Sequence, residues 1–215
     1  MGLAHRQAAR RRVLLRHERA LWTQGLMHVA GVDEVGVGPL AGPLVAAAVI
    51  LPHECEVRGI DDSKKLTAAR REALRAEIEA CAVAVGIGVV EVRDVERLNT
   101  YWASIEAMRR AVAALAVPPQ QVLVDARHIP GLAMPQLALV KGDARSYSIA
   151  AASIVAKVVR DAMMTQLDGR YPAYGFARHM GYGTVEHLAA LERHGPCPAH
   201  RRSFLPVAQA RLPGL

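Results

Sequence analysis

The sequence contains only three cysteines, Cys55, Cys81 and Cys197, and no two of them have a CxxC spacing. An odd number of widely separated cysteines indicates neither a disulfide framework nor a zinc ribbon, and a reducing cytoplasm is their natural setting. Long apolar runs are also missing, because none could cross a bilayer without including a charged or turn-forming residue. These absences predict a cytoplasmic protein that is not embedded in a membrane.

The basic segment near the N-terminus has little apolar sequence behind it. RQAARRRVLLRHERALW offers only the short patch VLL, which is too little for the core of a signal peptide. We therefore expect a basic solvated helix over residues 1–27, either as a plain surface element or in contact with nucleic acid. The formal net charge of +7 favours a polyanionic partner such as nucleic acid, although a membrane surface or solubility alone also fits it.

Internal repeats and low-complexity linkers are absent, and 215 residues with 52% apolar content suffice for one substantial core. Apolar runs with β-branched residues predict strands at residues 28–32, 44–51, 81–90, 122–124 and 137–140. Helical spacing predicts helices at residues 67–80, 103–115, 146–167 and 184–194. This order predicts an α/β sheet followed by a C-terminal helical appendage, with a boundary after about Leu167.

The segment GVGPLA matches the dinucleotide-binding pattern GxGxxA through Gly36, Gly38 and Ala41. That interpretation fails on context, because such a turn must open a helix whereas Pro39 breaks one and residues 44–51 resume a strand-like run. A hairpin fits better. Its glycines either make a simple tight turn or let main-chain amides approach a sugar or phosphate, and the local sequence leaves both interpretations open.

Acidic residues stand where strand-like runs end. Asp33 and Glu34 close the first run, Asp125 follows VLV, and Asp143 follows LVKG. If these strands run in similar directions, the acids converge on one edge of the sheet, which is where α/β sheets place their ligands. Carboxylate oxygens suit Mg²⁺ or Mn²⁺ better than zinc, so the four acids together favour a metal site of that kind.

Two other patterns are weaker candidates. His194, Cys197 and His200 have the spacing HxxCxxH, but prolines interrupt it and only three ligands are present, which disfavours zinc. Asp161 lies in a helical pattern one turn after Lys157, so we expect an ion pair with a structural or supporting role.

Five ordered motifs carry a family resemblance: DEVGVGPLAGP, DDSKKL, KGDARSYSIAAASIVAKVVRD, HMGYGT and HRRSF. Together they resemble ribonuclease HII, the type 2 ribonuclease H of bacteria, over about residues 29–204. The resemblance implies a ribonuclease H-like mixed sheet flanked by helices, with a C-terminal helical extension. Together with the basic N-terminal helix expected at 1–27, this divides the chain into three parts, with a catalytic domain at 28–167 and an extension at 168–215 that contributes to substrate binding.

The resemblance implies a metal-dependent endonuclease that cleaves RNA in RNA:DNA hybrids. The same family cuts on the 5′ side of ribonucleotides embedded in duplex DNA, leaving 3′-hydroxyl and 5′-phosphate ends. The positions that match the family's motifs make Asp33, Glu34, Asp125 and Asp143 the catalytic and metal-binding carboxylates. They would act with two Mg²⁺ or Mn²⁺ ions that activate water and stabilise the leaving oxygen.

We expect substrate contacts at Gly36, Val37, Gly38 and Tyr182, which the resemblance implies, and at the cations Lys64 and Arg201. Choosing RNA over DNA requires sensing the 2′-hydroxyl, a task that the family gives to the main chain of this glycine turn. Val37 stands where the family has a basic residue, so a side-chain contact with phosphate is lost there. One of Lys64 and Lys65 is expected to contact phosphate, with Ser63 as a backbone cap. The small side chains of SIAAASIVAKV are expected first to build the core, and the alternative is that Ser153 or Lys157 reaches the scissile strand.

Two competing hypotheses come from other classes. The first hypothesis is a hybrid-binding protein that no longer cuts: Val37 leaves it open, although the intact acids argue against it. A dinucleotide-dependent enzyme is weakened by the broken helix after Gly38. We take a monomer as the default state, and leave open whether the N-terminal helix contacts a replication clamp.

Overall fold

The computed structural model describes residues 2–210. Its centre is a five-stranded sheet in the order β3-β2-β1-β4-β5. The strands are β1 (Val29–Val35), β2 (Leu44–Ile50), β3 (Ala84–Val90), β4 (Gln121–Asp125) and β5 (Gln136–Leu139). β2 pairs antiparallel with both β1 and β3, whereas β4 is parallel to β1 and β5 is parallel to β4. This mixed sheet confirms the predicted fold class.

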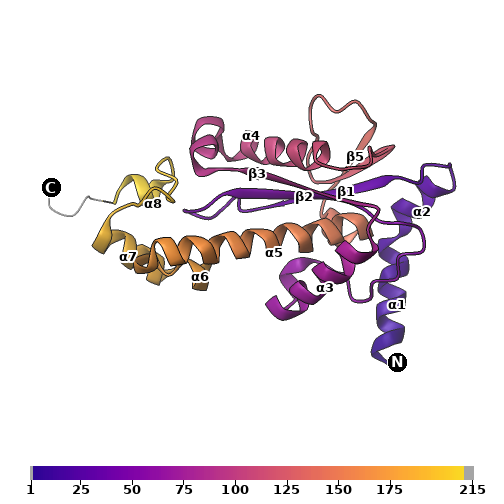
Figure 1. Ribbon diagram of the computed structural model, residues 1–215, viewed down its shortest axis with the longest axis horizontal. Helices are drawn as coiled ribbons and strands as arrows, with labels where there is room; N and C mark the ends of the chain where they lie inside the picture. Colours follow the sequence, from indigo (N-terminus) through magenta and orange to yellow (C-terminus); the bar gives the residue numbers. More distant parts are fainter. Residues whose placement is uncertain (1, 211–215) are drawn as a thin grey trace.

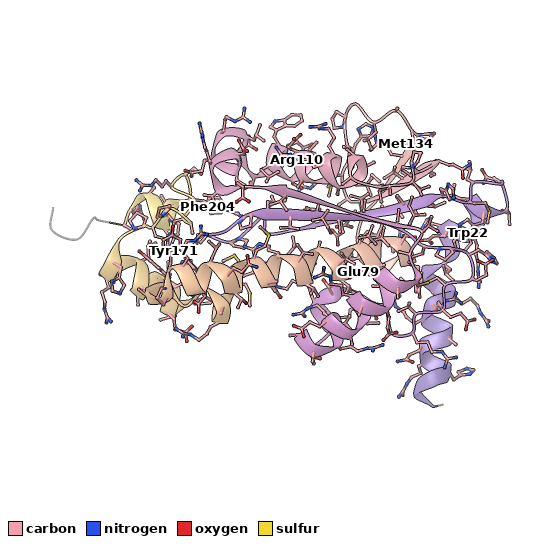
Figure 2. The ribbon with its side chains drawn as sticks, in the orientation of Figure 1. Trp22, Glu79, Arg110, Met134, Tyr171 and Phe204 are labelled. Carbon is pink, nitrogen blue, oxygen red and sulfur yellow. A yellow bond between two sulfur atoms is a disulfide. The ribbon has the colours of Figure 1, made fainter. Side chains whose placement is uncertain are left out.

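Helices cover both faces of the sheet. α4 (Val92–Ala113) lies on one face, and α3 (Ala68–Cys81) and α5 (Tyr147–Arg170) lie on the other (Figure 1). The strands alternate accordingly: on β4, Leu123 belongs to the core layer that includes α5, and Val122 and Val124 belong to the layer that includes α4. Side chains fill both layers (Figure 2). The sheet is therefore buried on both sides, and its functional groups must emerge at strand ends.

α5 approaches β1 closely at Gly31. A Cβ atom at Gly31 would collide with the main chain of Ser148 and Ile149. The small side chains of the run SIAAASIVA allow this approach, as the sequence predicts for packing against a sheet. The contact fixes the start of α5 beside β1, two residues before Asp33.

α4 is longer than predicted. The sequence predicts a helix from residue 103, whereas α4 begins at Val92. Asn99 interrupts it with φ 62° and ψ 167°, and its Oδ1 accepts hydrogen bonds from the amides of Tyr101 and Trp102. The prediction missed the first turns because this break divides the apolar periodicity.

The basic N-terminal segment forms two helices rather than one. α1 (Leu3–Leu14) and α2 (Arg16–Trp22) meet at the buried Leu15. Glu18 of α2 is also buried, and its Oε1 accepts hydrogen bonds from Ser146 Oγ at 2.6 Å and from the Ser148 amide at 2.9 Å. The segment is thus attached to the start of α5 and is not a free arm.

Short helices make up the C-terminal part. They are η3 (Pro172–Tyr174), α6 (Phe176–His179), α7 (Val185–His194) and α8 (Leu205–Ala208). α5 continues to Arg170, three residues beyond the boundary expected after Leu167. This part lies at the far end of the molecule from α1 (Figure 1).

The cysteine prediction needs a correction. Cys55 and Cys81 form a disulfide whose Cα atoms lie 6.1 Å apart, and Cys197 alone is a free, buried thiol. The pairing was missed because 26 residues separate the two cysteines, and only the packing of α3 against the loop after β2 brings them together. Across residues 2–210, no helix is both long and apolar enough to span a membrane.

Candidate active site

The parallel pairing of β1 with β4 brings the first three acids together. The register matches Val32 with Val124, so Asp33 and Asp125 occupy the next position on adjacent strands. Asp33 is 6% exposed, and its Oδ1 accepts a hydrogen bond of 2.7 Å from the Glu34 amide. Asp125 is the last residue of β4. The expected convergence of Asp33 and Asp125 on one edge is present, but only Asp125 ends its strand, because β1 continues two residues beyond Asp33 to Val35.

The fourth acid arrives on η2 (Gly142–Ala144), a single turn between β5 and α5. The Gly142 amide donates a hydrogen bond of 2.6 Å to Asp125 Oδ1, which ties this turn to the end of β4. A Cβ atom at Gly142 would lie 2.7 Å from Ile149 Cδ1 and 3.2 Å from Asp125 Oδ1, so a larger residue there would displace these side chains. Asp143, the next residue, is buried beside this contact.

Burial and mutual repulsion change the acidity of the group. Burial first, and then the charges of Glu34, Asp125 and Asp143, raise the pKa of Asp33 well above its usual value. Burial also raises the pKa of Glu34, against the opposing effect of Arg127. The pKa of Asp125 is raised by burial and by Asp143, although the Gly142 amide lowers it. The four carboxylates are therefore close enough to repel one another.

Two cations lie beside these acids. Lys64 Nζ is 3.7 Å from Asp143 Oδ2, and the Lys64 side chain is 83% exposed. Burial lowers the pKa of Lys64, but the charges of Asp143, Asp62, Asp33 and Asp125 together raise it more. This lysine can stay charged at the rim of the acidic group and turn toward a phosphate.

The second cation, Arg127, was missed by the sequence analysis. Its Nε donates a hydrogen bond of 3.3 Å to Glu34 Oε1, and its guanidinium lies 5.2 Å from the ring centre of Tyr101. Its position two residues after Asp125, directly beyond a strand end, was the available signal. Arg127 holds Glu34 in place and partly neutralises it.

The donor chemistry of the site suits a hard divalent cation. All four candidate ligands are carboxylates, and Glu34 Oε2 is buried without a hydrogen-bond partner of normal geometry. In residues 2–210, however, no three His, Cys, Asp or Glu side chains converge as a formed metal cluster. Arg127, Lys64 and the Gly142 amide instead pair with these acids. The fit to such an ion therefore rests on the chemistry of the four carboxylates and on the unpartnered Glu34 Oε2.

The glycine turn adjoins the acids and is held by a buried arginine. Gly36 has φ +100°, which favours glycine. Arg201 donates hydrogen bonds to the carbonyl oxygens of Gly36 at 2.6 Å, Val37 at 3.1 Å and Gly42 at 2.8 Å. Within the described residues, no hydrogen bond uses the amides of Val37 or Gly38 as donors. The turn therefore has its carbonyls engaged and its amides available.

The burial of Arg201 corrects one expectation. Arg201 is 0% exposed, so its guanidinium supports the turn from inside and is not available for direct contact with nucleic acid. Burial, followed by repulsion from Arg160, lowers the pKa of Arg201 to about 10. Arg160 is also buried and donates to the carbonyls of Pro43, Met180 and Ala41. Main-chain carbonyls, rather than carboxylates, satisfy both guanidinium ions.

Tyr182 stands beside this turn. Tyr182 is 45% exposed, and its Cε1 lies 3.9 Å from where a Cβ of Gly38 would be. His179 and His187 hold the loop behind it, because the Tyr182 amide donates to the His179 carbonyl and the Tyr182 carbonyl contacts His187 Nδ1. The exposed ring is available to a ligand on the turn.

The DDSKKL segment differs in detail from the expectation. Asp62, not Ser63, caps η1 (Ser63–Lys65), because its Oδ1 accepts from the Lys64 amide. Ser63 is buried and its Oγ lies 2.7 Å from Ser153 Oγ. Neither serine is therefore free to reach a substrate strand.

The structure also shows the surroundings of Asp161 and of the HxxCxxH residues. Asp161 pairs with Lys157 at 2.7 Å and with Arg71 at 3.5 Å, which confirms the expected ion pair. Of the HxxCxxH residues, Cys197 Sγ lies 3.1 Å from His200 Nδ1. His200 Nε2 lies 3.0 Å from His187 Nε2, so this cluster is a buried packing unit.

Comparison with known proteins agrees with this geometry. The family model described as Ribonuclease HII matches residues 30–207. A ribonuclease HII of Geobacillus thermodenitrificans is 58% identical over 206 residues, covering 95% of this chain and 79% of that relative. The family model covers the glycine turn and the edge of the sheet that carries Asp33, Glu34, Asp125 and Asp143, which we call the acidic edge.

Solved structures share the fold. The ribonuclease H2 of Pyrococcus horikoshii OT3 superposes with a TM-score of 0.70 and 25% identity, covering 86% of this chain and 97% of that one. The ribonuclease HII in a PCNA complex from Archaeoglobus fulgidus gives a TM-score of 0.69 and 26% identity, covering 80% and 91% of the two chains. With its sheet, its acidic edge and these matches, the chain belongs to the ribonuclease HII family, whose members are endoribonucleases.

Proposed function

We propose that this endoribonuclease uses Mg²⁺ or Mn²⁺ to cleave RNA in RNA:DNA hybrids and to cut 5′ of ribonucleotides embedded in duplex DNA. The products would carry 3′-hydroxyl and 5′-phosphate ends. The observation that carries the proposal is Asp33, whose pKa is raised first by burial and then by the charges of Glu34, Asp125 and Asp143 around it. Burial and mutual repulsion disfavour the charged forms of these four acids, and a divalent cation bound between them would offset that repulsion.

Asp33, Glu34, Asp125 and Asp143 would hold the metal. Two such ions, when bound, supply an activated water and stabilise the oxygen that leaves phosphorus. The Gly142 amide fixes Asp125, and Arg127 orients Glu34 through Oε1 so that Oε2 remains available. Lys64 is placed to neutralise a phosphate beside Asp143. These residues bind and position the scissile phosphate.

Selection of RNA would depend on the glycine turn. The amides of Val37 and Gly38 can donate to a ribose 2′-hydroxyl, because Arg201 holds the turn through its carbonyls alone. The exposed ring of Tyr182 beside Gly38 offers an apolar surface for the neighbouring sugar. Val37 contributes no charge here, so junction affinity rests on the main chain and Tyr182.

The three-part division is part of this proposal. Residues 28–167 would form the catalytic domain, and residues 168–215 would present Tyr182 to the substrate. The Arg160 and Arg201 contacts support a rigid connection between these parts. We place the protein in the cytoplasm as a monomer. The archaeal relative in a PCNA complex makes a sliding clamp a reasonable additional partner.

The test uses three labelled duplexes, with a single ribonucleotide, with an RNA stretch paired to DNA, and with DNA alone. Wild type in Mg²⁺ or Mn²⁺ should cut the first two, 5′ to the ribonucleotide in the first, and leave the third intact. Cutting of the hybrid alone would overturn the junction activity. Retained binding without any cutting would favour a non-catalytic hybrid-binding protein.

A further inference from the structure

A strongly basic surface lies outside the site described above. We call it the arginine surface, and it comprises Arg6, Arg10, Arg11, Arg12, Arg58 and Lys65. α1 carries four of these residues and no acid in its sequence LAHRQAARRRVL. Figure 1 shows α1 extending from the body on the side of the sheet that carries α3 and α5.

Two clefts open along this surface. One has a volume of about 380 Å³ and is lined by Arg6, Arg10, Arg11 and Lys65, with Asp61 as its acid. The other has a volume of about 320 Å³ and is lined by Arg11, Arg12 and Arg58, with Glu56 as its acid. Cations outnumber acids in both clefts, which favours an anionic ligand along α1.

The arginine surface is fixed to the turn that carries Asp143. Arg10 Nη2 donates to the carbonyl of Ala144, the residue after Asp143, at 3.1 Å and to Asp61 Oδ1 at 2.7 Å. Glu18 of α2 binds Ser146 and the amide of Ser148 from the same side. α1 therefore keeps a constant position relative to the acids, as an extension of one binding path requires.

Part of this charge has no internal partner. Arg10 pairs with Asp61, and Arg11 donates to the Cys55 carbonyl and lies over the Tyr147 ring. Within residues 2–210, the guanidinium groups of Arg6, Arg12 and Arg58 form no ion pair with an acid. Exposed cations without a structural role are the groups that a phosphate backbone can engage at little cost.

We infer that the arginine surface binds the sugar-phosphate backbone of the nucleic-acid duplex outside the cleavage point. The inference rests on the proposed function, because a duplex lying on Asp143 is the polyanion whose continuation passes beside Ala144 and Arg10. α1 has 12 residues and is thus about 18 Å long, a length over which duplex DNA presents several phosphates. The contact is independent of base sequence and extends the substrate footprint.

The test compares the double variant Arg6→Gln/Arg12→Gln with Arg97→Gln/Arg109→Gln. Both lower the net charge by two. The control arginines lie on α4 and pair with Asp94 and Glu106, so their charge is locally compensated. Affinity is measured by fluorescence anisotropy in chelator at several salt concentrations. The probes are a duplex ending near its single ribonucleotide and one extending well beyond it on both sides.

The inference predicts that Arg6→Gln/Arg12→Gln binds the long duplex about tenfold more weakly and lowers the magnitude of its salt slope by about 2 units. The loss should be smaller for the short duplex and absent in the control variant. Unchanged affinity for the long duplex, or an equal loss in both variants, would overturn the inference. Failure of wild type to cut any ribonucleotide-containing duplex would instead count against the proposed function, since binding is scored separately.

Discussion

Arg201 Nη2 lies 2.6 Å from the carbonyl oxygen of Gly36, and the same guanidinium also reaches the carbonyls of Val37 and Gly42. One buried side chain from the C-terminal part thus holds both ends of the glycine turn. Since the carbonyls face Arg201, the turn is fixed with its Val37 and Gly38 amides unpaired. This relationship links the last motif of the chain to the first.

Replacing Arg201 should destabilise the protein. Arg201→Gln leaves several buried carbonyls without donors, and we expect the free energy of unfolding to fall by about 3 kcal/mol. Thermal or urea unfolding measures this loss. Arg202→Gln is the matched control, because Arg202 is exposed and should change stability little. Equal unfolding midpoints for the two variants would contradict the role assigned to Arg201.

Removing one charge from the acidic edge should make the metal-free protein more stable, because the remaining carboxylates then repel one another less. The pKa of Asp33 is raised in the folded state, so its protonated form favours folding at low pH and this contribution is lost as pH rises through the folded pKa. Asp33→Asn keeps an oxygen for the Glu34 amide and removes the charge. In chelator near neutral pH, we expect it to be more stable by about 1 kcal/mol.

The sign of this effect can be checked by its pH dependence. The stability difference between Asp33→Asn and wild type should shrink toward zero as pH falls toward about 4, the ordinary range of a carboxyl group. Thermal unfolding in chelator from acidic to neutral pH measures it. A difference that grows toward low pH would mean that Asp33 is stabilised as an anion, against the proposed repulsion.

Divalent cations should stabilise the wild-type protein. An ion that binds only the folded state at 100 times its dissociation constant adds about 2.7 kcal/mol. We therefore expect the Tm to rise with Mg²⁺ or Mn²⁺, and to rise much less in Asp125→Asn. The same Tm increase in both proteins would show that the ions act elsewhere.

A basic residue at position 37 should tighten junction binding. Val37 is half-buried and packs on the α4 side of the core, next to an exposed Gly38. In Val37→Arg, the methylene groups of the arginine can pack where the valine packs, and the guanidinium can point toward a phosphate. We expect a few-fold gain in affinity for a duplex with one ribonucleotide, and a salt slope steeper by about 1 unit. Affinity that does not change would mean that the side chain faces away from the substrate.

The strand ends were the part of the site most accessible from sequence. Asp125 directly follows an apolar β-branched run, and the parallel pairing of β1 with β4 places it beside Asp33. The surrounding groups were harder to predict. Arg201 looked like a surface cation, since sequence does not reveal that carbonyls 159 to 165 residues away satisfy it. Cys55 and Cys81 likewise meet only through tertiary packing.

The most direct test of the acidic edge is single-turnover cleavage of a duplex with one ribonucleotide in Mg²⁺. Asp143→Asn is compared with Asp161→Asn, a matched change at an acid that pairs with Lys157 and Arg71 instead. We predict that Asp143→Asn is slower than wild type by about 1,000-fold or more, while Asp161→Asn stays within about tenfold. Near-wild-type cleavage by a folded Asp143→Asn protein would contradict the assignment of the four acids as the catalytic centre.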